Sequence, residues 1–111
     1  MTRYRVSRDA ELDLDEIFLC WAQRAGPDDA DRLIDSIIDR FWLVGEHPDA
    51  GRPADEIAAR VKCFPAGKYL IYYRRTRRGT EILHIFHRSD AGFQEGGEAR
   101  VGRRPRWRAW R

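Results

Sequence analysis

The chain has 111 residues, of which 42% are hydrophobic and 35% charged, which predicts one globular domain rather than a disordered chain. No apolar run is long enough to cross a bilayer and the N-terminus lacks a signal-peptide pattern, so we expect no membrane contact and a cytoplasmic location. Cys20 and Cys63 lie far apart in apolar contexts and are predicted to be reduced, buried thiols.

The net charge of +3 conceals a strong asymmetry along the chain. Residues 1–59 carry seven Arg and fourteen acidic residues, whereas residues 60–111 carry fourteen Lys or Arg and four acidic residues. This division predicts an acidic side and a basic side, and a basic side suits an acidic partner such as nucleic acid or an acidic protein segment. Genomic base composition can itself raise the Arg content, so that content alone is no evidence of nucleic-acid binding.

The first helix is predicted after a short strand at residues 4–6. Ser7 can cap it, and Asp9 and Glu11 suit the positive end of the helix dipole. Gly26 and the following proline end it. Its apolar face is Leu14, Ile17, Phe18, Trp21 and Ala25, and its acidic residues Asp9, Glu11, Asp13, Asp15 and Glu16 are interpreted as a solvated face.

A second helix begins near Asp28, and the short turn between the helices predicts an antiparallel helical hairpin. Trp42 lies one position away from the apolar stripe of this helix. It is therefore either an edge residue of the core or an exposed anchor for a partner. The stripe itself consists of Leu33, Ile34, Ile37, Ile38, Phe41 and Val44.

The second half of the chain predicts a three-stranded antiparallel meander, which the helical hairpin covers. The connection at residues 47–53 is rich in turn formers, and residues 54–59 can form one helical turn. Strands are expected at residues 61–64, 69–73 and 82–86, with turns at 65–67 and 75–80, and one of the last two strands is expected to be central. The predicted fold class is thus α+β: an N-terminal strand, a helical hairpin and a meander.

Periodicity ends after His87, so we divide the chain into a domain at residues 1–91 and a flexible Arg/Trp-rich tail at residues 92–111. Arg residues interleaved with Trp suit weak nucleic-acid contact through phosphates and base stacking. They equally suit docking on an acidic protein surface. The third interpretation of the tail is a segment with no role of its own.

Four sequence features in this order resemble the ParE branch of the RelE/ParE toxin superfamily. They are Ala-Glu-x-Asp-Leu-x-Glu-Ile at residues 10–17, Asp-Ala-Gly-Arg-Pro at 49–53, Phe-Pro-x-Gly-x-Tyr-x-Ile-x-Tyr-Arg at 64–74, and a last strand that ends in His87. The resemblance covers about residues 3–90. The chain differs from the family pattern after His87, where Arg88 does not occupy the position of the Arg in the usual His-x-x-Arg-Asp ending.

The resemblance implies the toxin of a type II toxin–antitoxin pair, a plasmid-stabilisation system whose toxin inhibits growth. It implies a complex with a ParD-like antitoxin and, for the ParE branch, inhibition of DNA gyrase by binding, without a cofactor or metal. Two alternatives remain open: a RelE-like ribosome-dependent mRNA endonuclease, and an inactive binding module with the toxin fold.

For the endonuclease alternative the candidate groups are Lys62, Tyr73, Arg74 and His87, with Lys68 considered beside them, because cleavage needs proton transfer and phosphate stabilisation. Each has a structural interpretation too. Tyr69 and Tyr73 alternate with Ile71, which suits packing side chains whose hydroxyls reach water. Lys62 and Lys68 flank a turn, where solvated charges are common. His84 and His87 suit structural roles. The Cys and His residues show no zinc-type spacing.

For the binding function we expect an acidic antitoxin segment to cover the basic edge of the sheet and the groove beside the helical hairpin. Reversed charges there should weaken the complex and steepen its salt dependence. The predicted antitoxin-binding residues are Arg60, Lys62, Lys68, Arg74, Arg75, Arg77 and Trp42.

Overall fold

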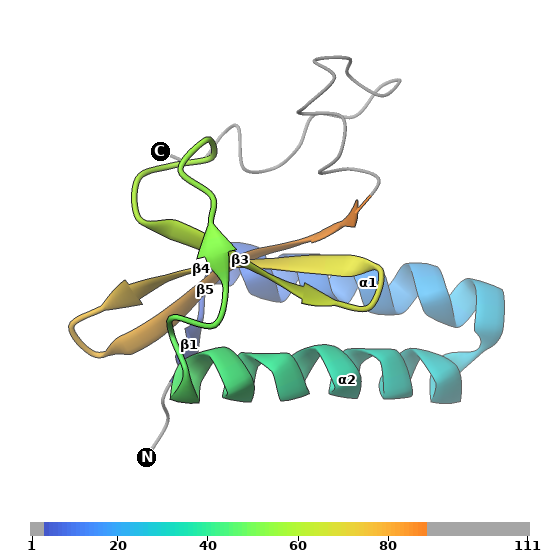
Figure 1. Ribbon diagram of the computed structural model, residues 1–111. Coiled ribbons are helices and arrows are strands. Elements are labelled where there is room, and N and C mark those ends of the chain that lie inside the picture. Colours follow the sequence, from blue (N-terminus) through green and yellow to red (C-terminus); the bar gives the residue numbers. More distant parts are fainter. Residues whose placement is uncertain (1–3, 89–111) are drawn as a thin grey trace.

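The computed structural model describes residues 4–88, which form two helices and five strands. Two long helices lie against one side of a twisted sheet (Figure 1). In chain order the elements are β1 (Tyr4–Val6), α1 (Arg8–Ala25), α2 (Pro27–Glu46), β2 (Arg52–Pro53), β3 (Val61–Ala66), β4 (Tyr69–Thr76) and β5 (Gly79–His87). Within this part of the chain, neither helix is long and apolar enough to span a membrane.

The strand order of the sheet is β1-β5-β4-β3-β2. Strands β3, β4 and β5 form the predicted antiparallel meander, and β4 is the central strand. Strand β1 pairs in parallel with β5, and the two-residue β2 extends the other edge. The α+β fold and its helical hairpin are therefore confirmed, whereas β2 and the parallel pairing come from the structure alone.

Local signals position both ends of the helical hairpin. The hydroxyl of Ser7 accepts a hydrogen bond from the amide of Ala10 at 3.1 Å, which confirms the predicted cap of α1. Gly26 ends α1 with a φ of 95°, a backbone conformation that residues other than glycine rarely adopt. Pro27 then starts α2 at a position where its missing amide hydrogen costs nothing.

The sheet buries apolar side chains on both of its faces. The face toward the helices holds the main core, which is Ala10, Ile37, Phe41, Val44, Ala66, Ile71, Tyr73, Ile82 and Ile85. The opposite face holds a smaller cluster, to which the turn that follows β2 contributes. Its buried members are Ala54, Val61, Cys63, Tyr72, Leu83 and Phe86. Burial on both faces explains why the sequences of β4 and β5 are almost continuously apolar.

Both hairpin turns of the meander are shorter than predicted. The predicted turn at residues 65–67 is wrong, because β3 continues to Ala66 and the chain reverses at Gly67, whose φ is 62°. The predicted connection at residues 75–80 is also wrong, because only Arg77 and Arg78 lie outside the strands. The hydroxyl of Thr76 accepts from the amide of Arg78 and donates to the carbonyl of Gly79, which closes this two-residue turn.

The prediction that Asp13 is solvated is wrong, since its side chain is only 4% exposed. Strand β1 pairs with residues 80–82 of β5, so the later part of that edge lacks a strand partner. Helix α1 lies along this edge instead. A carboxylate oxygen of Asp13 accepts from the amide of Ile85 at 3.0 Å and lies 3.1 Å from Nδ1 of His84. Asp13 thus takes the place of a strand partner for the free edge of β5. The contact also confirms the structural role predicted for His84.

The prediction of two buried thiols holds for Cys63 and is wrong for Cys20. Cys20 lies on the exposed side of α1, whereas Cys63 is in the smaller cluster. Both cysteines are free thiols. The tail at residues 92–111 lies outside the described residues.

Candidate partner-binding surface

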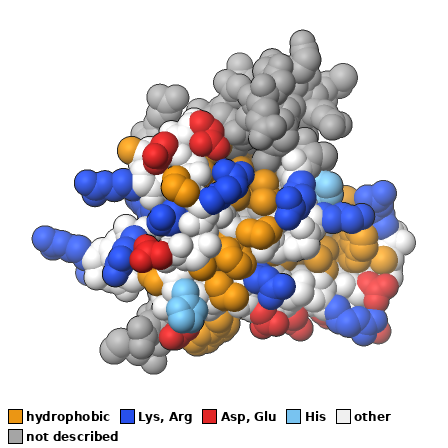
Figure 2. All heavy atoms as spheres, in the orientation of Figure 1, with side chains coloured by type: hydrophobic (Ala, Val, Ile, Leu, Met, Phe, Trp, Pro, Cys, Tyr) orange, Lys and Arg blue, Asp and Glu red, His pale blue; other side chains and the backbone are white. Residues whose placement is uncertain are grey.

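Four of the predicted binding residues lie together at one end of the sheet, which we call the basic end. Arg60 immediately precedes β3, whose first residue pairs with Arg74 of β4. Arg75 follows on β4, and Arg77 lies in the turn to β5. All four side chains are exposed. Figure 2 shows Lys and Arg side chains that extend from this end of the sheet, on the left. The basic end comprises Arg60, Arg74, Arg75 and Arg77 together with Arg5 and Arg78.

Arg5 and Arg78 belong to this surface as well, although neither was among the binding residues predicted from the sequence. Arg78 lies in the predicted connection at residues 75–80, next to Arg77. Its position beside predicted binding residues could therefore have indicated that it belongs to the same surface. Arg5 pairs with Glu81 through the parallel contact of β1 with β5, which no local pattern indicates. Arg5 and Arg74 both form ion pairs with Glu81, at 3.2 Å and 3.3 Å. These two cations are therefore partly neutralised, whereas Arg75 and Arg77 form no ion pair within residues 4–88.

The two lysines lie apart from this group. Lys62 is half-buried on β3, between Pro53 of β2 and Tyr73 of β4. Lys68 is exposed in the turn at the opposite end of the sheet, where its carbonyl accepts from the amide of Arg88. The structure therefore divides the predicted binding residues between two ends of the sheet.

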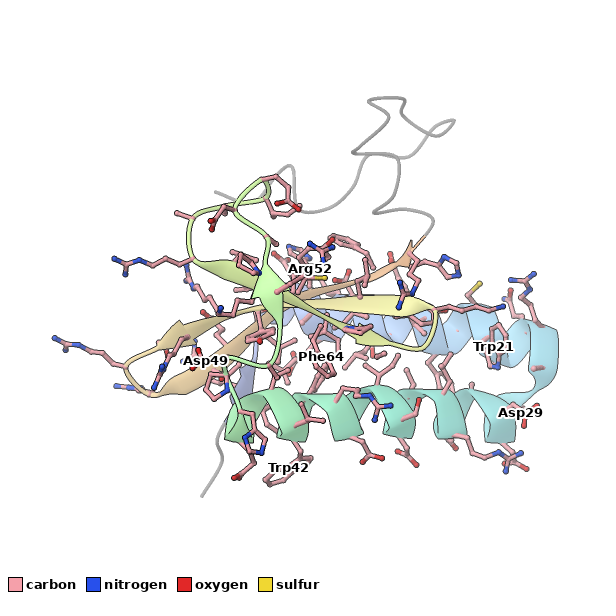
Figure 3. The ribbon with its side chains drawn as sticks, viewed as in Figure 1. Trp21, Asp29, Trp42, Asp49, Arg52 and Phe64 are labelled. Atoms are coloured by element: carbon pink, nitrogen blue, oxygen red, sulfur yellow. The ribbon has the colours of Figure 1, made fainter. Side chains whose placement is uncertain are left out.

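Trp42 is exposed to 48% and projects from α2 away from the sheet (Figure 3). It contacts Tyr4 edge to face, with ring centroids 5.5 Å apart. Tyr4 pairs with Thr80, whose hydroxyl donates to the carbonyl of Val44 in α2. These contacts position Trp42 at the same end of the molecule as the basic end. An exposed tryptophan beside exposed cations can anchor an apolar group of an acidic partner.

The connection between α2 and β2 is held by Tyr73. This side chain is fully buried, and its hydroxyl donates to the carbonyl of Pro48 and accepts from the amide of Gly51, both at 2.8 Å. A Cβ atom at Gly51 would lie 2.5 Å from that hydroxyl oxygen, so only glycine fits here. The packing role predicted for Tyr73 is confirmed, but the prediction of a hydroxyl in water is wrong. The Asp-Ala-Gly-Arg-Pro sequence therefore positions Arg52 at the sheet edge.

The four candidate nuclease residues are not brought together. Arg74 pairs with Glu81, and His87 lies six residues further along β5, which corresponds to roughly 20 Å. His87 instead contacts Tyr69 edge to face at 5.2 Å between ring centroids. Lys62 is opposite Tyr73, but the Tyr73 hydroxyl is engaged with the backbone.

Cys63 and Tyr72 form the polar part of the smaller cluster. Burial raises the pKa of the Cys63 thiol and of the Tyr72 hydroxyl, and the two groups also interact with each other. Arg52 opposes this increase in both pKa values. Both groups are therefore neutral near pH 7, which makes the thiol a poor nucleophile. Among residues 4–88 no group of three or more His, Cys, Asp or Glu side chains is placed to hold a metal ion.

Comparison with known proteins gives matches over most of the chain. Residues 4–92 match the family described as the ParE toxin of the type II toxin–antitoxin system parDE. Toxin ParE1 of Caulobacter vibrioides is 32% identical over 89 residues, which are 80% of this chain and 92% of the relative. Toxin ParE1 of Mycobacterium tuberculosis is 30% identical over 87 residues, which are 78% and 89% of the two chains.

A solved structure described as the chromosomal ParDE system from P. aeruginosa has the same fold. Its TM-score is 0.68 at 22% identity, over 76% of this chain and 92% of that chain. The helical hairpin and the meander thus agree with the sequence matches and confirm the resemblance found in the sequence. The chain belongs to the ParE toxin family of type II toxin–antitoxin systems.

Proposed function

We propose that this ParE-family toxin inhibits growth by binding DNA gyrase, and that a ParD-like antitoxin neutralises it in a hetero-oligomer. The family membership supports this proposal, since the curated relatives are ParE toxins and the similar solved structure is a ParDE system. The basic end and Trp42 supply a surface that suits an acidic, partly apolar segment.

The observation that most favours a binding mechanism is the state of Tyr73. Its hydroxyl is buried between Pro48 and Gly51 and has a structural role there. A general acid or base must come within hydrogen-bonding distance of the reacting atoms. In the described arrangement Tyr73 has no access to a substrate, and His87 is too far from Arg74 to act with it.

Inducible expression without an antitoxin tests the target. We expect growth arrest, loss of negative supercoiling in a reporter plasmid, and intact transcripts in the same cells. Arrest with cleaved transcripts and unchanged supercoiling would contradict the gyrase proposal and favour a ribonuclease. Normal growth with folded protein present would favour an inactive binding module.

Charge reversal tests the binding surface separately from the target. The double variant Arg75→Glu and Arg77→Glu should bind the cognate antitoxin more weakly, and the salt dependence of its affinity should be altered. The matched control is Arg24→Glu with Arg40→Glu, which changes the charge equally on exposed helix positions. Equal affinities of the two double variants would refute the role of the basic end.

A further inference from the structure

The outward side of α1 carries an apolar stripe that nothing in the described part of the chain covers. Leu12 is 38% exposed and Leu19 is 61% exposed. The two leucines are seven residues apart, so they lie on the same side of the helix. Glu11 and Asp15 are exposed alongside them. We call this surface, formed by Leu12, Leu19, Glu11 and Asp15, the acidic stripe.

The composition of the acidic stripe defines the chemistry of an occupant. Burial of the leucines needs apolar side chains, and the flanking carboxylates need positive charge. A second copy of α1 does not meet this need. Antiparallel pairing of two such helices across Leu12 and Leu19 would bring Asp15 of one copy against Glu16 of the other, and like charges there oppose association.

The chain itself contains a segment of the required chemistry. Residues 100–111 include six Arg and the tryptophans Trp107 and Trp110, with no acidic residue. Helices α1 and α2 together carry eleven acidic residues and four Arg, so the two charges are strongly opposite. We propose that residues 100–111 dock on the acidic stripe of the same chain, with tryptophan against Leu12 and Leu19 and arginine against the carboxylates.

Residues 89–99, which connect β5 to residues 100–111, are long enough for residues 100–111 to reach the acidic stripe. The tail follows β5, the strand whose outer edge lies along α1 through the contact of Asp13 with Ile85. Arg88 fixes the start of this connection beside the turn between β3 and β4, because its guanidinium donates to the carbonyl of Gly67 at 2.9 Å. Residues 89–99 can reach roughly 36 Å when extended, and α1 is roughly 27 Å long. Such a short tether gives an effective concentration of about 1 mM, at which weak contacts suffice.

Limited trypsin digestion of the full chain tests the proposal, since trypsin cleaves after Arg. We expect tail cleavage to be slow at low salt and to accelerate with salt. Cleavage should be at least about fivefold faster in the double variants Leu12→Gln with Leu19→Gln and Glu11→Lys with Asp15→Lys, because the docked state loses its apolar or its ionic contacts. Mass spectrometry of the products locates each cut, and circular dichroism checks that the variants remain folded.

The matched control is Asp35→Lys with Asp39→Lys, which makes the same change of charge on exposed positions of α2. This variant should retain the wild-type cleavage rate. Equal tail cleavage in all four proteins would overturn the proposal. Protection that appears only at high protein concentration, with a doubled mass in solution, would also overturn it, because the tail would then occupy another copy.

Discussion

At the scale of single residues, Tyr73 connects the sheet to the loop that follows α2. Replacement by Phe removes the donor for the Pro48 carbonyl and the acceptor for the Gly51 amide, which leaves two polar groups without partners. We expect Tyr73→Phe to lower the free energy of unfolding by about 1–3 kcal/mol in urea denaturation. Tyr4→Phe is the control and should change it by less than about 0.5 kcal/mol. Equal effects would show that the two hydrogen bonds contribute little.

The two thiols should differ in reactivity because their surroundings differ. Cys20 is exposed, whereas Cys63 is buried and burial raises its pKa. We expect a thiol reagent at neutral pH to modify one thiol per native chain and two after unfolding. Cys20→Ser should abolish the rapid reaction. Rapid labelling in that variant would contradict the buried placement of Cys63.

At the scale of elements, Asp13 joins α1 to the edge of β5. Its carboxylate contacts both His84 and the amide of Ile85 in a buried position, so its loss removes a hydrogen-bond partner from Nδ1 of His84 and leaves the Ile85 amide unpaired. We expect Asp13→Ala to lower the free energy of unfolding by about 1–3 kcal/mol, measured by urea denaturation. Asp15→Ala, on the exposed side of the same helix, should cost less than about 0.5 kcal/mol. Similar values for both variants would mean that the edge contact is not stabilising.

At the scale of the whole molecule, the buried neutral groups determine the response to alkaline pH. Burial raises the pKa of Tyr72, Tyr73 and Cys63 above their ordinary values of 10.0, 10.0 and 9.0. The folded chain therefore keeps protons that the unfolded chain releases. The corresponding stability is complete below the unfolded pKa values and falls as the pH rises above them.

Denaturation at a series of pH values checks this behaviour. We expect the free energy of unfolding to decrease between about pH 8.5 and pH 11, and the decrease to be smaller in Tyr72→Phe. Absorbance of tyrosinate should rise together with unfolding rather than before it. A stability that is unchanged over this range would contradict the burial of these groups.

Features that depend on interactions between nearby residues could be predicted from the sequence, whereas features that depend on distant contacts could not. Ser7, Gly26 and the spacing of Ile37 and Phe41 are local signals, and each predicted its helix correctly. Asp13 has the same local surroundings as the exposed Asp15, and only the free edge of β5 distinguishes them. Arg5 is separated from Glu81 by most of the chain, so no pattern near it could place it at the basic end.

The sequence by itself determined the α+β class, the helical hairpin, the meander and the family resemblance, because periodicity and turn residues act over a few positions. The tertiary structure decided which charges come together. It joined β1 to β5, assembled the basic end, separated Lys68 and His87 from it, and buried the hydroxyl of Tyr73. These features depend on contacts between residues that are distant in the chain, and such contacts form only when the sheet assembles.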